Sequence, residues 1–166
     1  MAQNSKTKLL KAHNLLFVKS TIKQAERLES LKAGVIAAVS LWVAFIFTTV
    51  VNSLFLAQYF VALSSLRVDS VTWQWLVRGA IAIVCGLLFG VTYRYAIRSD
   101  DNFQLKSGTV LAFGLVRGLT QLDIGLNTPD SVLPFVVMAG ESIFWFALAA
   151  VILNWAMQRG WVKTFN

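Results

Sequence analysis

An uncharged apolar run of 25 residues, Ala33–Ala57, constrains this chain more than any other feature. At about 1.5 Å per residue, a helix of this length crosses a hydrocarbon core about 30 Å thick with some tilt. A helix also satisfies its own backbone hydrogen bonds, which lipid cannot do. The run therefore predicts a transmembrane helix, which would also serve as an uncleaved membrane-insertion signal because the preceding residues are polar or amphipathic.

Three more apolar segments follow, and they fix the expected fold class. Hydrophobic residues make up 57% of the chain and charged residues 14%, a balance outside the usual range of soluble domains. We predict an all-α polytopic membrane protein, a four-transmembrane-helix bundle over residues 33–166 that follows an N-terminal segment, residues 1–32. The expected spans are about 33–57, 73–97, 108–124 and 131–157.

The N-terminal segment predicts a basic amphipathic helix. Leu15, Val18, Ile22, Ala25 and Leu28 recur at spacings of three and four, with polar residues mostly between them. Such a helix either lies on an anionic membrane surface, docks on a partner's helix, or is a solvated lead-in to the first span. The candidate residues for membrane-surface or partner contact are Lys11, Lys19, Lys23 and Arg27.

The distribution of positive charge predicts the orientation. Of the 15 Lys and Arg residues, twelve lie before the first span, between the second and third spans, or after the fourth. The positive-inside rule therefore places both termini on the cytoplasmic side, or on the stromal side of a thylakoid. An even number of spans gives the same result.

Two charges, Arg117 and Glu141, interrupt the third and fourth apolar segments near the expected midplane. Each would cost several kcal/mol there if isolated, about 2.5 to 3.5 for Arg on insertion scales. We therefore predict a buried Arg117–Glu141 ion pair, direct or bridged by water. The pair either sets helix register and packing or marks a proton or cation site.

A second polar level is expected nearer the side opposite the termini. Asn52 is the only strongly polar residue of the first span, and it could bond to a neighbouring helix. The third span is the shortest and most polar, so we expect it in the interior of a bundle or assembly. The predicted secondary cluster comprises Asn52, Arg78, Gln121 and Asp123.

Small residues at four-residue spacing predict close helix packing in the second and third spans. The candidate packing residues are Ala82, Gly86, Gly90, Gly114 and Gly118. They pack within this chain or form a dimer face. The tetrapeptide LVRG occurs at residues 76–79 and again at 115–118, which is either a coincidence or the trace of a duplicated unit.

The sequence offers little for catalysis. It has one histidine, His13, and one cysteine, Cys85, and it lacks HExxH, a Ser-His-Asp set, CxxC and a phosphate-binding glycine loop. We expect no enzyme activity and no metal site, and the sequence names no cofactor. We do not expect nucleic acid as a partner, because the basic residues lie at the edges of apolar runs. Lipids and other membrane subunits, or further copies of the chain, are the expected partners.

The block GVTYRYAIRSDDNFQLKSGTVLAFGLVRGLTQLDIG, residues 90–125, and the later AGESIFWFALAA resemble small integral membrane proteins of cyanobacteria and chloroplasts that have no assigned chemistry. The resemblance implies a thylakoid or cyanobacterial plasma membrane location and an auxiliary or assembly role with photosynthetic complexes. It transfers no functional residue. The expected function is a non-enzymatic scaffold, assembly or auxiliary subunit, and the alternative is a small oligomeric transporter or channel that uses Glu141 and Arg117.

Overall fold

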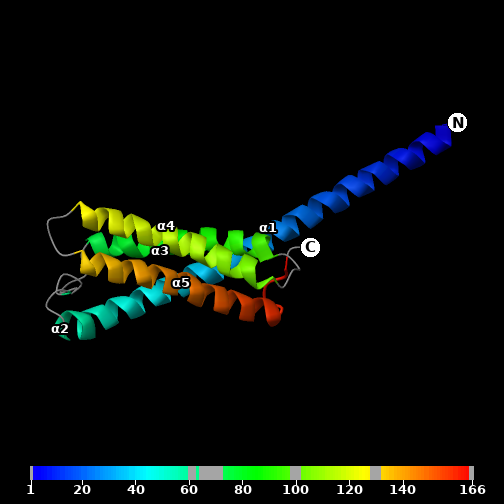
Figure 1. The fold of residues 1–166 in the computed structure, drawn as a ribbon. Helices are drawn as coiled ribbons and strands as arrows, with labels where there is room; N and C mark the ends of the chain where they lie inside the picture. The colour runs from blue at the N-terminus through cyan, green and yellow to red at the C-terminus, as the bar shows by residue number, and fades with distance from the viewer. Residues whose placement is uncertain (1, 60–62, 64–72, 98–101, 128–131, 165–166) are drawn as a thin grey trace.

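The computed structural model describes residues 2–59, 63, 73–97, 102–127 and 132–164, with side chains from Gln24 onward except that of Ala57. The described elements are helical (Figure 1). They are α1 (Ala2–Val51), a π-helical segment η1 (Asn52–Leu56), α2 (Ala57–Tyr59), α3 (Trp73–Ile97), α4 (Phe103–Leu126) and α5 (Leu133–Gln158).

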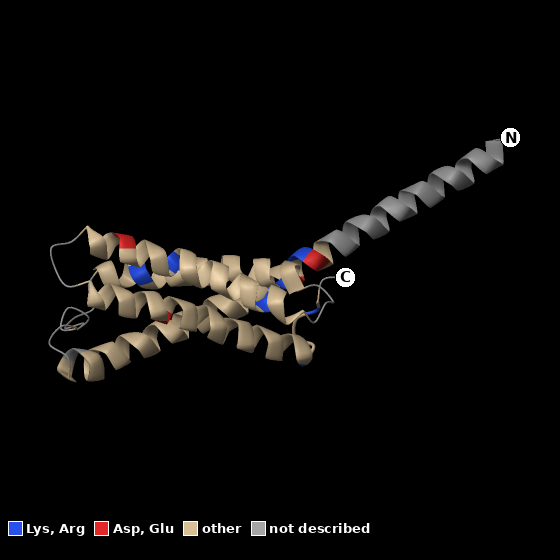
Figure 2. Cartoon of the chain, in the orientation of Figure 1, with Lys and Arg blue, Asp and Glu red and all other residues tan. Residues whose placement is uncertain are grey.

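The predicted all-α bundle is confirmed. Four helices are long and apolar enough to cross a membrane: Gln24–Leu56, α3, α4 and α5. Figure 2 shows charged residues at both ends of the bundle and few along its middle. Many apolar side chains on these helices are exposed, as lipid-facing positions of a multi-pass membrane protein are.

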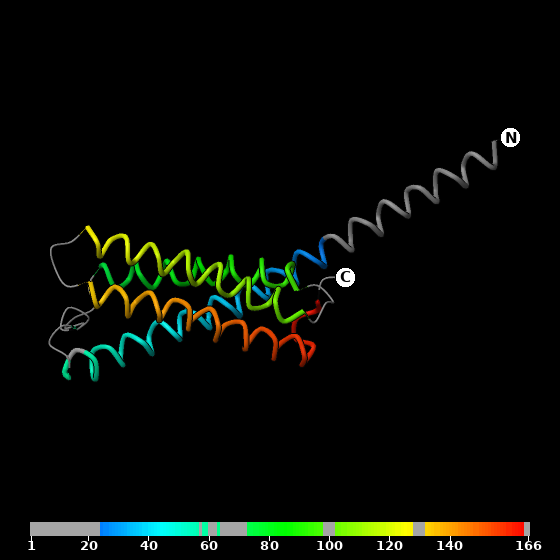
Figure 3. The backbone as a smooth tube through the Cα atoms, in the orientation of Figure 1, coloured from blue at the N-terminus to red at the C-terminus, as the bar shows by residue number. Residues whose placement is uncertain are grey.

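The first helix does not stop where the sequence suggested. We expected a separate amphipathic helix up to residue 32, but α1 runs unbroken from Ala2 to Val51. Lys32 and Ala33 do not break a helix, and the next residue, Gly34, is buried against α3. The N-terminal part of α1 therefore continues as a helix beyond the ends of the other helices (Figure 1). Figure 3 traces α1 from Gln24 onward into the bundle.

The bundle consists of two tightly packed helix pairs. Helix α1 packs along α3, α4 packs along α5, and α1 also crosses α5, whereas α3 meets α4 and α5 less extensively. Helix α4 is the least buried of the four spans, with 17% of its most apolar 18 residues buried. We expected this helix in the interior of a bundle or assembly. Within this chain α4 lies at the edge of the bundle, because it packs mainly on α5 through its glycine face.

Small residues let the backbones approach each other within both pairs. A Cβ atom on Gly86 would lie 2.9 Å from the carbonyl oxygen of Ala37, and one on Gly90 would overlap Ala33. In the other pair, a Cβ on Gly114 would lie 2.9 Å from Cα of Ile143. The remaining predicted packing residues behave alike: Ala82 is buried, and Gly118 lies against Ala139. These positions serve packing within the chain.

Aromatic side chains fill the space that the closely packed pairs leave between them. Phe89 on α3 is fully buried, and its ring centroid lies 5.4 Å from that of Phe113 on α4 and 5.1 Å from that of Phe146 on α5. Rings at such distances gain from tilted and edge-to-face contacts beyond their buried area. Phe89 therefore joins three helices at one level.

Helix α4 begins earlier than expected. We predicted a third span of about residues 108–124, but α4 starts at Phe103. The side chain of Asn102 accepts a hydrogen bond of 2.9 Å from the backbone N–H of Gln104, so Asn102 is the N-cap. An N-cap satisfies a free N–H of the first turn, which explains why the polar residues after it are helical.

Candidate functional site

The carboxylate of Glu141 is held by an amide from the first helix. Glu141 lies about 12 Å along α5 from Leu133, and it is partly buried. The Nδ2 of Asn52 donates a hydrogen bond of 2.6 Å to its Oε1. Asn52 therefore does bond to a neighbouring helix, as its position in the first span suggested.

Asn52 lies where the first helix changes from α-helical to π-helical geometry, and its side chain reaches α5. The π-helical segment η1 begins at Asn52, where the regular hydrogen bonding of α1 gives way to the wider turn. Asn52 is buried, and in the described part of the chain its Oδ1 has no hydrogen-bond partner. Single π-helical turns are rare and occur frequently at functional sites. The Asn52–Glu141 bond therefore joins an irregular backbone to an intramembrane carboxylate.

Arg117 has different surroundings. Its guanidinium carbon lies 4.6 Å from the ring centroid of Trp145, and Nη1 lies 3.8 Å from Sγ of Cys85. Among the described residues, neither its Nε nor the indole Nε1 of Trp145 has a hydrogen-bond partner. A cation over an indole face is worth about 2 kcal/mol when desolvated. The ring thus replaces part of the solvation that water would give.

The predicted direct ion pair between Arg117 and Glu141 is absent from the described residues, and this corrects the sequence analysis. The expected depths agree with the structure: Gly114 contacts Ile143 and Gly118 contacts Ala139, which puts Arg117 level with Glu141. The two side chains diverge, because Arg117 reaches Cys85 of α3 whereas Glu141 reaches Asn52 of the first helix. Spacing along a helix fixes depth, but rotation about the axis decides the partner.

The predicted secondary cluster does not form as a unit. Within the described part of the chain, Asn52 is the one of its four members with a side-chain bond to another helix, and that bond goes to Glu141. Arg78 and Asp123 are exposed, and Gln121 is partly buried. The backbone oxygen of Asp123 accepts a bond of 2.8 Å from Nδ2 of Asn127, which closes the end of α4.

A second polar site, which the sequence analysis missed, surrounds Arg94 at the other end of α3. The Arg94 side chain is fully buried, and its Nη2 lies 2.6 Å from Oε2 of Glu26. Nη1 donates to Oγ of Ser30 at 2.6 Å, and Nε donates to the backbone oxygen of Lys163 at 2.8 Å. One guanidinium therefore ties α1, α3 and the C-terminal tail together.

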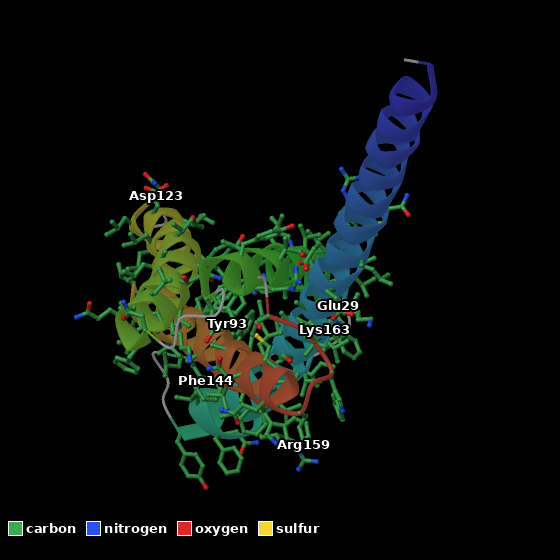
Figure 4. The ribbon with its side chains drawn as sticks, turned by 90° about the vertical axis from the view of Figure 1, so that its right-hand side faces the viewer. Glu29, Tyr93, Asp123, Phe144, Arg159 and Lys163 are labelled. Atoms are coloured by element: carbon green, nitrogen blue, oxygen red, sulfur yellow. The ribbon has the colours of Figure 1, made fainter. Side chains whose placement is uncertain are left out.

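The C-terminal tail makes a second contact with α1. The backbone N–H of Lys163 donates to Oε2 of Glu29 at 3.1 Å, and the other oxygen of Glu29 accepts from Lys32 at 2.8 Å. Figure 4 shows Glu29 and Lys163 side by side. The sequence contained a signal for this site, since Glu26 and Glu29 are the only carboxylates of the otherwise basic first 32 residues.

Several predicted contact residues fall outside the description. The side chains of Lys11, Lys19 and Lys23 belong to the part of α1 that is described by its backbone alone, while Arg27 is exposed. Within the described residues, no group of three His, Cys, Asp or Glu side chains could hold a metal ion. The polar contacts of the described residues are hydrogen bonds, ion pairs of Arg94 with Glu26 and of Lys32 with Glu29, and cation–π contacts such as that of Arg117 on Trp145.

No protein-family model matches the chain, and neither the curated proteins nor the solved structures contain a match. The resemblance of residues 90–125 to small cyanobacterial and chloroplast membrane proteins therefore stays an expectation.

Proposed function

We propose that this chain is a non-enzymatic membrane protein that serves as a scaffold, assembly or auxiliary subunit of a larger membrane complex. The observation that supports the proposal is the N-terminal part of α1, which extends beyond the bundle as a helix (Figure 1). Isolated helices are marginal in water, and most helices are stabilised by packing. A partner's surface or an anionic membrane provides that packing.

The resemblance stated above supports a more specific version of the proposal. It implies a thylakoid or cyanobacterial plasma membrane location and an auxiliary or assembly role with photosynthetic complexes. Fractionation of the membranes of a cyanobacterium that expresses the chain tests the location. Recovery outside both membranes contradicts it.

Co-purification in mild detergent tests the scaffold function. The full chain is expected to retain partner subunits, and a variant with Lys11, Lys19, Lys23 and Arg27 changed to Gln is expected to lose them. The matched control changes Asn14, Ser20 and Gln24 to Ala, which alters the same helix and keeps every charge. A chain that purifies without any partner subunit, or equal retention by both variants, contradicts the proposal.

A second candidate function is a small oligomeric transporter or channel. It is favoured by Glu141, whose carboxylate is bonded to Asn52 at a π-helical turn, and by Arg117 at the same depth. Ionisable residues within a membrane often mark proton or ion pathways. Proton or cation flux into proteoliposomes, measured for the wild type and for Glu141→Gln, tests this function. Flux that requires Glu141 supports the transporter, and equal or absent flux excludes it.

A further inference from the structure

A groove lies at the end of the bundle that carries both termini. It is about 300 Å³ in volume, and Leu28, Leu31, Val35 and Ile36 of α1 form its floor. Trp161 of the C-terminal tail forms one side, and Lys32 stands at its edge. The groove is apolar apart from Lys32.

The wall formed by Trp161 is built into the fold. Gly160 has a φ of 74°, and the N–H groups of Gly160 and Trp161 donate to the carbonyls of Met157 and Ala156. This is a Schellman motif, which ends α5 and turns the chain back. The next residue, Val162, is buried in the core, and the backbone of Lys163 is bonded to Arg94 and Glu29. Trp161 is therefore fixed beside α1.

The groove runs from the charged end of the first span into its apolar part, where a membrane interface is expected. It follows α1 for about 12 Å from Leu28 to Ile36, from the charged residues into the long apolar run. Trp155 and Trp161 lie edge to face with centroids 5.2 Å apart, and both are largely exposed. Paired tryptophans at a helix end are typical of the membrane interface.

The charges around the groove suit an anionic ligand. Arg27, Lys32, Arg159 and Lys163 are exposed at this end of the bundle. Two carboxylates lie here among the described residues: Glu26 pairs with the buried Arg94, and Glu29 is bonded to Lys32 and to the backbone of Lys163. Positive charge therefore exceeds negative charge in the described part of this end. Cations next to a membrane attract anionic lipids at about 1 kcal/mol each.

We propose that this groove binds an anionic phospholipid. One acyl chain lies along Leu28, Val35 and Ile36 against Trp161, and Lys32 and its neighbouring cations hold the phosphate at the groove's edge. The apolar floor requires a chain and the cationic edge requires a negative headgroup, so neither a free anion nor a neutral lipid satisfies both.

Thermal unfolding of the purified full chain in detergent tests the proposal. Phosphatidylglycerol at roughly 100 times its Kd should raise the midpoint by about 5 °C or more. Phosphatidylcholine and inorganic phosphate should raise it little. The variant Val35→Trp should abolish the shift by filling the groove. Val43→Trp, at an exposed position two turns further along α1 and outside the groove, should keep it.

Lys32→Gln gives an independent test, because Lys32 is an exposed side chain whose loss leaves the helix packing intact. It should weaken the phosphatidylglycerol shift while Val43→Trp does not. An equal shift by phosphatidylcholine would overturn the proposal, as would a full shift in Val35→Trp or in Lys32→Gln. A rise of the unfolding midpoint with inorganic phosphate but not with phosphatidylglycerol would show that the cations bind a free anion, and it would also overturn the proposal. Loss of a co-purifying protein in Val35→Trp, with an unchanged lipid shift, would show that a partner's helix occupies the groove.

Discussion

At the scale of single residues, the intramembrane charges are stabilised by unlike means. Glu141 receives a hydrogen bond from Asn52, whereas Arg117 rests on the indole of Trp145 beside Cys85. Neither charge is stabilised by a direct contact with the other, because their side chains reach different helices. The cost of burying each charge is therefore reduced in part, by an amide for Glu141 and by an aromatic face for Arg117.

A pair of double-mutant cycles separates these contacts. Asn52→Ala and Glu141→Ala should show a coupling of about 1 kcal/mol, because interhelical hydrogen bonds in membranes average about 0.6 and reach about 1.7. Arg117→Ala and Glu141→Ala should be additive to within about 0.5 kcal/mol. Reversible unfolding in mixed micelles measures both cycles. A strong coupling between Arg117 and Glu141 would contradict the contacts described above.

The contacts of Arg94 with Glu26, Ser30 and Lys163, here called the Arg94 junction, predict a larger effect on stability. Glu26→Ala leaves the buried guanidinium without its carboxylate, which in a buried pair costs roughly 3–5 kcal/mol. Because the Glu26 side chain is 30% exposed, the loss should fall near the lower end, about 3 kcal/mol. Arg27→Ala, on the neighbouring exposed position, is the matched control and should change stability by less than about 0.5 kcal/mol. Proteolysis of the C-terminal tail should increase in Glu26→Ala alone.

At the scale of elements, glycine faces determine which helices pair. Gly86 and Gly90 bring α3 onto α1, and Gly114 and Gly118 bring α4 onto α5. The same spacing motif in two helices thus serves two separate interfaces. The π-helical turn at Asn52 is the irregular element, and it lies where the first helix meets the intramembrane carboxylate.

Two glycine-to-alanine changes should act in opposite directions. Gly90→Ala places a methyl group against the carbonyl of Ala33, so it should destabilise the protein by about 1–3 kcal/mol. Gly140→Ala meets no atom within 4 Å and removes a helix-interior glycine, which should stabilise the protein by about 0.5–1 kcal/mol. The unfolding midpoints of the two variants measure the difference. A neutral Gly90→Ala would show that α1 and α3 can separate freely.

At the scale of the whole molecule, the four spans bring the N-terminal helix and the C-terminal tail to one end of the bundle (Figure 1). The Arg94 junction, the groove and the exposed cations all lie there. The proposed contacts with partners and with anionic lipids would therefore lie on one side of the membrane, the side that also carries the connection between α3 and α4.

Cysteine labelling tests the proposed orientation. In a Cys85→Ser background, Asn4→Cys and Thr164→Cys should react with a membrane-impermeant maleimide only after the cells are opened. When the chain is expressed in a bacterial plasma membrane, Ser65→Cys, in the connection between the first two spans, should react in intact cells. Labelling of position 164 in intact cells would reverse the orientation.

The sequence by itself determined the number of spans, their approximate limits and the common depth of Arg117 and Glu141, because apolar length and axial rise depend on local spacing alone. It did not reveal that α1 continues through residue 32, that α4 lies at the edge, or that Arg94 is the buried centre of a junction. These features depend on helix rotation and on contacts between residues up to 134 positions apart, such as Glu29 and Lys163. Only the tertiary structure decided that Glu141 binds Asn52 and that Arg117 turns to Trp145.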